Sequence, residues 1–170
     1  HTEPTDLNPA GLYGNRFAAA PWKSVEPAIE VLNPPQPANI LAMAAPACGY
    51  GEYEPEEIEH ILQTAYTGFT AAKAMTRQHN TDTECEIHAG FWGCGAFGGN
   101  RELMARLQIL AAWLAEVGRL CFFGFDERDE DRFEDMVADC EDLATQAHET
   151  SDLIEEIAAR GYEWGVSDGN

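Results

Sequence analysis

The sequence is poor in basic side chains, and lysine is almost missing from it. Of 170 residues only 10 are Lys or Arg, against 30 Asp or Glu, which gives a formal net charge of −20 at pH 7. The two lysines are Lys23 and Lys73. Because each contact with a nucleic-acid phosphate or an anionic lipid wants a cationic side chain, this balance argues against a general nucleic-acid or membrane surface. An anionic ligand stays compatible with the sequence if backbone N–H groups bind it.

Several other patterns are missing. No apolar run is long enough to span a bilayer, and the N-terminal residues lack the basic-then-apolar pattern of a signal peptide. The chain begins at His1 without an initiator methionine, which indicates a processed product or one piece of a longer chain. The five histidines show neither an HExxH motif nor paired ligand spacing, so we expect no metal site, and no motif indicates a cofactor.

The cysteines form no CxxC pair. An odd number of scattered cysteines, at or near apolar segments, predicts reduced and buried thiols in a cytoplasmic protein. The five are Cys48, Cys85, Cys94, Cys121 and Cys140.

Hydrophobic residues make up 45% of the chain, enough for one globular domain with a full core. Helical spacing of apolar residues predicts helices at about 55–77 and 101–117, and one or two acidic amphipathic helices within 126–156. Alternating or continuous apolar runs predict strands at 28–33, 38–46, 84–90 and 119–125. Because strands and helices largely alternate along the chain, we expect an α/β layered fold with a mostly parallel central sheet.

The same pattern divides the chain into four segments. Residues 1–27, rich in Pro, Gly and Ala, are expected to be an irregular lead-in, and residues 28–126 to form the α/β core. Residues 127–160 are expected to be acidic amphipathic helices that pack on the core, with their carboxylates in water rather than around a metal. Residues 161–170 are expected to be a loose tail, in which Trp164 is the candidate anchor.

The most unusual segment is IHAGFWGCGAFGGN, at residues 87–100. It holds five glycines, three aromatics and one cysteine, and no Asp, Glu, Lys or Arg. It joins a predicted strand to a predicted helix, which is the arrangement that binds phosphates at the carboxyl end of a parallel strand. Its glycines allow positive φ and let amides face a ligand without a Cβ in between. The segment is therefore compatible with phosphate binding, but GCGAFG matches the GxGxxG pattern only weakly and the Lys of a P-loop is missing.

Each prominent side chain of this segment has a second interpretation. The turn could instead pack Trp92 and Phe97 into the core and bind nothing. Cys94 could be a nucleophile, but a structural thiol is favoured because no His–Asp partners are readable. His88 is interpreted as a hydrogen-bonded core histidine.

Together with its surroundings, the glycine segment forms a longer pattern. WGCGAFGG at 92–99 is followed by Gln108 with LAA at 110–112, and then by CFFGF at 121–125. Upstream lie NILAMAAP at 39–46 and AYTGFTAAKAM at 65–75. Over roughly residues 38–126 this pattern resembles the C-terminal part of the poly(ADP-ribose) glycohydrolase catalytic domain. The resemblance implies a macrodomain-like three-layer α/β/α sandwich, with a mostly parallel central sheet, that binds ADP-ribose or an ADP-ribosylated protein.

The resemblance also implies roles for individual positions. Phe125 would stack on the adenine ring. Phe91 stands where the family has Asn and would lie beside the ribose. The loop that binds the diphosphate and the distal ribose would consist of Gly93, Cys94, Gly95, Ala96, Phe97, Gly98 and Gly99.

The family's catalytic signature, a Gly-Gly-Gly turn followed by Gln-Glu-Glu, has no counterpart in this sequence. We reject EPEE at 54–57 as a substitute, because it opens a helix, where such carboxylates act as caps. The resemblance then predicts a glycoside hydrolase acting on ADP-ribose linkages whose catalytic carboxylate lies outside this chain. A missing N-terminal segment or a partner chain would supply it and complete the sheet. The alternatives are a non-catalytic ADP-ribose or nucleotide-binding module, and a scaffold that keeps the loop only for packing.

Overall fold

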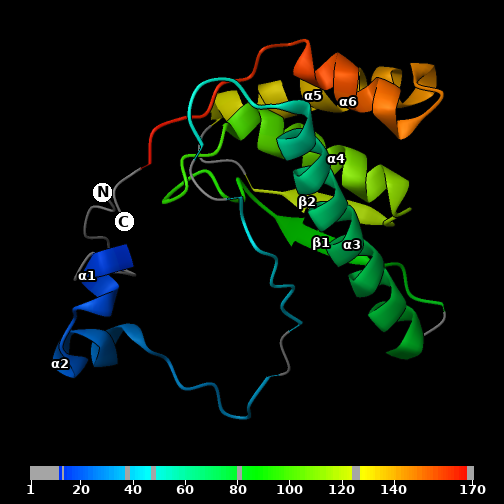
Figure 1. Ribbon diagram of the computed structural model, residues 1–170. Helices are drawn as coiled ribbons and strands as arrows, with labels where there is room; N and C mark the ends of the chain where they lie inside the picture. The colour runs from blue at the N-terminus through cyan, green and yellow to red at the C-terminus, as the bar shows by residue number, and fades with distance from the viewer. Residues whose placement is uncertain are drawn as a thin grey trace. The chain divides into compact units, whose positions relative to one another are not determined.

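The computed structural model describes residue 12 and residues 14–36, 39–46, 49–79, 82–123 and 127–167. Leu41–Ser167 form one compact unit, and the described residues before them belong to a second unit. Figure 1 shows the elements of both units. None of the helices in the described ranges is both long enough and apolar enough to cross a membrane.

The first unit consists of short helical turns. They are α1 (Gly14–Ala18), α2 (Trp22–Val25) and the 3-10 helix η1 (Glu26–Ala28). The lead-in expected to be irregular therefore contains helical turns. The strand expected at 28–33 does not form, and Val31 is 85% exposed. Alternation of apolar residues gives a strand only where a neighbouring strand takes up its hydrogen bonds, and none lies beside this segment in the described chain.

The sheet of the second unit has two described strands. β1 (Glu86–Ala89) and β2 (Arg119–Phe122) pair in parallel, with His88 opposite Cys121. They confirm the strands predicted at 84–90 and 119–125 and the parallel pairing. The described residues thus form an α/β unit with a narrow parallel sheet, in place of the wider sheet that four strands predicted.

The strand predicted at 38–46 is absent from the described residues 39–46. There the chain is irregular, Ile40 is 86% exposed, and the side chain of Met43 packs over Gly68 of α3 (Pro55–His79). The continuous apolar run predicts a strand buried on both faces. It instead contacts a helix, because no described strand pairs with it.

Four helices complete this unit (Figure 1): α3, α4 (Arg101–Leu114), α5 (Glu127–Gln146) and α6 (Thr150–Ala158). They confirm the helices that apolar spacing predicted, including the two acidic helices near the C-terminus. α4 contacts α3, α5 and β2, so residues on nearly every side of it are buried. The fully buried side chains of the core come mainly from α3 and α4: Ile58, Ile61, Phe69, Leu103, Met104, Leu107 and Leu110.

The ends of these helices have identifiable caps. α3 begins at Pro55, and the Glu57 carboxylate accepts a hydrogen bond from the Glu54 amide at 2.9 Å, so EPEE acts as a cap. α4 was expected to reach Val117 but ends at Leu114. Glu116 takes a left-handed conformation with φ 51°, and Lys73 Nζ donates to the Ala115 carbonyl at 2.9 Å.

The C-terminal tail is fixed to the start of the unit and is not loose as expected; Trp164, the candidate anchor, takes part in the attachment. The Tyr53 amide donates to the Tyr162 carbonyl at 2.8 Å, and the Trp164 amide donates to the Gly51 carbonyl at 2.7 Å. Residues 51–53 and 162–164 therefore run side by side. This pairing brings the tail to the N-terminal end of α4.

Candidate functional site

The glycine loop joins the end of β1 to the start of α4. Gly93 and Gly98 have φ of 76° and 65°, a left-handed conformation that side chains other than glycine rarely adopt. The Gly99 amide donates to the Gly93 carbonyl at 2.9 Å, which folds the loop back on itself. A Cβ at Gly99 would lie 2.8 Å from that carbonyl oxygen, so the fold-back needs glycine there.

Backbone amides of this loop fall into two groups. Those of Cys94, Gly98 and Gly99 already donate to loop carbonyls, at 3.1, 3.0 and 2.9 Å. Within the part of the chain that the structure describes, the amides of Gly93, Gly95 and Phe97 donate to no protein group. Donors without a protein acceptor therefore alternate along the loop at residues 93, 95 and 97. Amides without an internal acceptor can donate to an anion that reaches the loop.

The two large aromatics of the loop behave differently. Trp92 is half-buried and packs against the core, and its Nε1 is buried without a hydrogen-bond acceptor among the described residues. Phe97 is 45% exposed and is not in the core. The packing interpretation therefore holds for Trp92 but is wrong for Phe97, because the ring follows a turn whose outer side faces solvent.

Cys94 has the properties of a structural thiol. Its Sγ lies 3.6 Å from the Trp92 carbonyl oxygen, and burial raises the pKa of the thiol to about 12, against a smaller lowering by Arg101. A thiol with that pKa is protonated at neutral pH and is a poor nucleophile. The preference for a structural cysteine is thus supported.

Phe91 sits at the edge of an aromatic cluster. Its ring meets Phe122 edge-on with centroids 5.1 Å apart, and Phe122 stacks on Phe133 of α5 at 4.8 Å. The guanidinium carbon of Arg101 lies 5.0 Å from the centre of the Phe91 ring. Phe91 therefore places an apolar ring and an adjacent cation beside the loop. The expected adenine-stacking residue Phe125 lies outside the described residues.

Gln108 fixes the beginning of the loop from inside α4. Its side chain is buried, and its Nε2 donates to the carbonyls of Gly90 and Met104, each at 3.0 Å. Losing the bond to Gly90 would leave a buried donor unsatisfied. The glutamine was noted in the sequence through the family pattern only, and its contact explains why a polar side chain lies in an apolar helix.

Asn100 fixes the other end of the loop. Its Oδ1 accepts from the amides of Glu102 and Leu103, both at 3.1 Å, which caps α4. Its backbone amide donates to the Tyr53 hydroxyl at 3.0 Å. The positive end of the α4 dipole consequently points toward the loop. Asn100 was recognisable as a cap from its place before a helix, whereas nothing in the sequence pointed to Tyr53.

The C-terminal tail lies directly on the loop, a contact that sequence analysis missed. Ser167 Oγ donates to the Ala96 carbonyl at 2.7 Å. A Cβ at Gly98 would lie 2.9 Å from the Ser167 amide nitrogen, so the close approach depends on glycine. Ser167 stands far from the loop in sequence, and no motif marked it.

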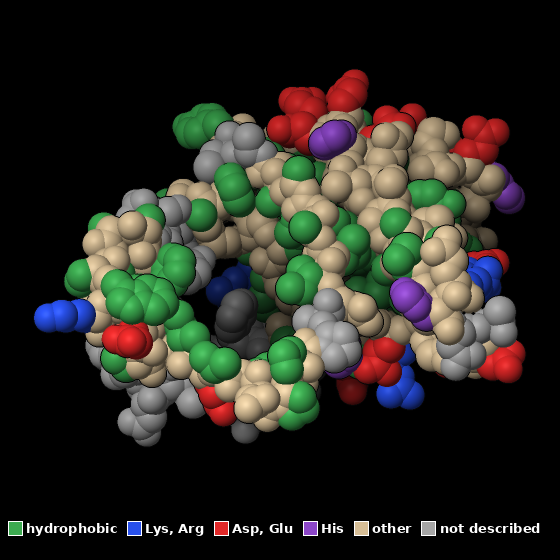
Figure 2. Space-filling view, turned by 90° about the horizontal axis from the view of Figure 1, so that it is seen from below, with side chains coloured by type: hydrophobic (Ala, Val, Ile, Leu, Met, Phe, Trp, Pro, Cys, Tyr) green, Lys and Arg blue, Asp and Glu red, His purple; other side chains and the backbone are tan. Residues whose placement is uncertain are grey.

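Cationic side chains contribute little to the surface. Figure 2 shows few and scattered Lys and Arg on the side of the molecule that it presents. At the loop itself the described cation is Arg101, the first residue of α4. An anion bound here would thus depend mainly on amides and the helix end.

The chain matches the model of a known protein family. A family model described as poly(ADP-ribose) glycohydrolase (PARG), macro domain fold, matches residues 23–132, which is more than half of the chain. The matched range contains the glycine loop, both strands and the helices α3 and α4.

Proposed function

Because the chain belongs to the poly(ADP-ribose) glycohydrolase family, which has the macro domain fold, we propose that residues 93–99 bind the diphosphate of ADP-ribose. We further propose that the chain takes part in hydrolysing ADP-ribose linkages. The observation that carries the proposal is the set of three amides, at Gly93, Gly95 and Phe97, that have no acceptor among the described residues. They lie on a glycine loop at the N-terminal end of α4, inside the family match.

The diphosphate would accept hydrogen bonds from these amides. Hydrogen bonds to an ionised acceptor are about twice as strong as neutral ones, so a few of them can hold a diphosphate on an acidic protein. The N-terminus of α4 adds a favourable field. Cys94, Gly98 and Gly99 would shape the loop through bonds they already make, and Ala96 would face the ligand beside Gly95.

Recognition of the sugar and base rests on two aromatic positions. We propose that Phe91 lies beside the ribose, where it offers an apolar contact in place of the amide of the family's Asn. We propose that Arg101, whose guanidinium lies over the same ring, approaches a phosphate. Phe125 is proposed to stack on adenine, a contact of about 1–3 kcal/mol.

Hydrolysis needs a general acid that protonates the leaving ribose oxygen while water attacks the anomeric carbon. The sequence contains no Gly-Gly-Gly turn followed by Gln-Glu-Glu, and EPEE at 54–57 caps α3. We therefore propose that the catalytic carboxylate comes from outside these 170 residues.

The narrow sheet supports the proposal that a further segment belongs to this fold. In the described chain β1 and β2 each pair on one side only, and an unpaired edge is where further strands add. We propose that an N-terminal segment or a partner chain pairs there and completes a three-layer α/β/α sandwich.

A second candidate is a non-catalytic module that binds ADP-ribose without cleaving it. The absence of the catalytic signature from the sequence favours it. Incubation with poly(ADP-ribose) separates the two functions. Release of ADP-ribose, alone or with a supplied family N-terminal segment, indicates a hydrolase, whereas polymer binding without release in both cases indicates the module.

Calorimetric titration with ADP-ribose tests the binding site. Gly95→Trp fills the space beside the loop amides and should abolish binding, while Thr67→Trp, on the exposed side of α3, should leave it unchanged. Circular dichroism checks that both variants fold. Equal affinity in the two folded variants would contradict the site.

A further inference from the structure

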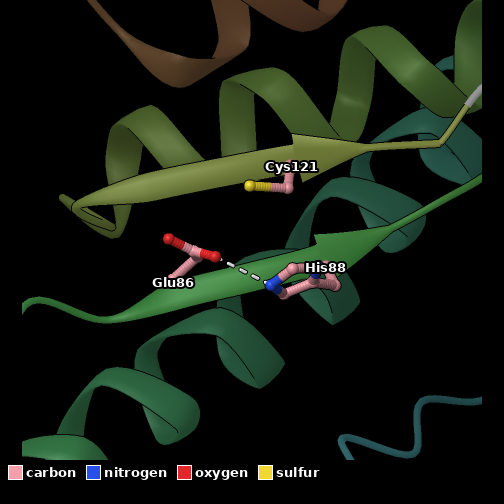
Figure 3. Close-up of side chains that lie close together, drawn as sticks. All are labelled: Glu86, His88 and Cys121. Carbon is pink, nitrogen blue, oxygen red and sulfur yellow. Dashed lines mark hydrogen bonds and ion pairs between the residues drawn. The ribbon is translucent and has the colours of Figure 1, made fainter.

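Three side chains of different chemistry meet on the face of the sheet away from the core. Glu86 and His88 are two residues apart on β1 and so point to the same side, while Ile87 between them is buried on the other. Cys121 on β2 is the register partner of His88. Figure 3 shows the three side chains converging on one space from the two strands, and their donor atoms all lie within 4.8 Å of one another.

The donors are the ones that zinc prefers. Zn²⁺ binds thiolate sulfur, imidazole nitrogen and carboxylate oxygen at about 2.0–2.3 Å, which places neighbouring donors of a tetrahedron roughly 3.3–3.6 Å apart. The present separations bracket that spacing, since His88 Nε2 lies 2.8 Å from Glu86 Oε1 and every pair lies within 4.8 Å. Small side-chain rotations therefore suffice, without movement of the backbone.

We propose that Glu86, His88 and Cys121 form a zinc-binding site. Three protein ligands leave the fourth tetrahedral position to water, as in zinc sites that are open to exchange. Glu86 Oε1 would bind the ion, while Glu86 Oε2 keeps its ion pair with Arg119 at 3.5 Å. The ion would replace the direct contact between His88 and Glu86.

The surrounding residues hold the three ligands in place and leave them accessible to an ion from solvent. Paired strands fix the backbone of all three residues, and the His88 ring stacks on Phe123 with centroids 5.6 Å apart. The side chains of His88 and Glu86 are 58% and 41% exposed, so an ion can enter from solvent. His88 is thus an exposed side chain and not the core histidine that the sequence predicted.

Pairing across strands explains why no spacing motif in the sequence indicated a metal site. Spacing rules detect ligands on one helix or in one short loop. Here two ligands lie on β1 and the third on a strand that follows α4, and only the parallel register brings Cys121 beside His88. The expectation of no metal site rested on that spacing.

Titration of the reduced protein with Co²⁺ and then Zn²⁺ tests the proposal. Co²⁺ should give a thiolate-to-metal charge-transfer band. One equivalent of Zn²⁺ should displace the Co²⁺ and abolish the band. Cys121→Ala should remove the band, while Cys85→Ala, at a buried cysteine of the same strand region, should keep it. His88→Ala and Glu86→Gln should each weaken zinc binding at least about tenfold, because even outer-shell changes cost that much. The matched controls His60→Ala and Glu84→Gln, at exposed residues, should leave zinc binding unchanged.

The readout is independent of ADP-ribose. Gly95→Trp should retain the cobalt band in full, because the loop supplies no ligand to the ion. Equal zinc affinity in the folded wild type, His88→Ala and Cys121→Ala proteins would overturn the zinc site and leave the proposed diphosphate site untouched. Loss of the band in Cys85→Ala with retention in Cys121→Ala would also overturn it.

Discussion

The indole of Trp164 stacks on the Tyr53 ring, with centroids 4.2 Å apart and an angle of 15° between the planes. Tyr53 is buried, and that burial raises its pKa to about 12. Its hydroxyl accepts a hydrogen bond from the backbone amide of Asn100, at the start of α4. The stack therefore connects the tail to the cap of the helix that follows the glycine loop. Ser167, farther along the same tail, reaches Ala96 within the loop.

Replacing Trp164 should loosen this connection. Trp164→Ala is expected to lower the free energy of unfolding by about 2 kcal/mol, less than for a fully buried tryptophan because the ring is half-buried. Urea denaturation measures the change. Val166→Ala is the control, since Val166 is 92% exposed in the same tail and should be neutral. A neutral Trp164→Ala would show that the stack does not stabilise the unit.

Gly93 should be sensitive to a single methyl group. Its φ of 76° lies in the left-handed region, and a Cβ there would be 3.3 Å from the Ala45 Cβ. Gly93→Ala is expected to lower the free energy of unfolding by about 1–2 kcal/mol. The matched control is Gly90→Ala, whose Cβ would meet the Phe123 carbonyl oxygen at an ordinary 3.6 Å. Equal midpoints of chemical denaturation in the two variants would contradict the loop conformation.

Asp139 joins α5 to the end of α6 and should make stability depend on pH. Hydrogen bonds from Arg160, at 2.7 and 3.0 Å, lower the pKa of the carboxyl, and the charge of Arg106 lowers it further, both against a rise from burial. A folded-state pKa below the unfolded one means that this stabilisation is present above pH ~4 and is lost as pH falls through the folded value.

Asp139→Asn should therefore cost about 1 kcal/mol at pH 7, a modest amount because the carboxylate is 37% exposed and screened by solvent. The cost should shrink as pH falls below about 4. Chemical denaturation at pH 7 and at a pH below about 4 measures the cost of the substitution. The control is Asp142→Asn, at an exposed residue of the same helix. A cost that is independent of pH would assign the effect to packing instead of charge.

Local features of the fold were predictable from the sequence, and features that depend on distant neighbours were not. α3 and α4 follow from apolar spacing, and Pro55 marks where the first of them begins. The strands expected at 28–33 and 38–46 require a partner that the local sequence does not encode. The wrong assignment of His88 to the core has the same origin, because the residue lies beside Cys121 only once the two strands pair.

The candidate site shows the same division. The glycine segment itself identified the loop, since its composition and its place between strand and helix are local. Which amides stay without a protein acceptor depends on the hydrogen bond from the Gly99 amide to the Gly93 carbonyl. The sequence does not reveal this fold-back of the loop. The contact of Ser167 with Ala96 was invisible for the same reason.

We propose that the amides of Gly93, Gly95 and Phe97 bind the diphosphate of ADP-ribose. Amide nuclear magnetic resonance on the ¹⁵N-labelled chain, titrated with ADP-ribose, is the decisive test. These three proton resonances should move downfield on binding, while those of Gly98 and Gly99, which already donate within the loop, should change much less. Unchanged resonances at residues 93, 95 and 97 at saturating ADP-ribose would contradict the claim.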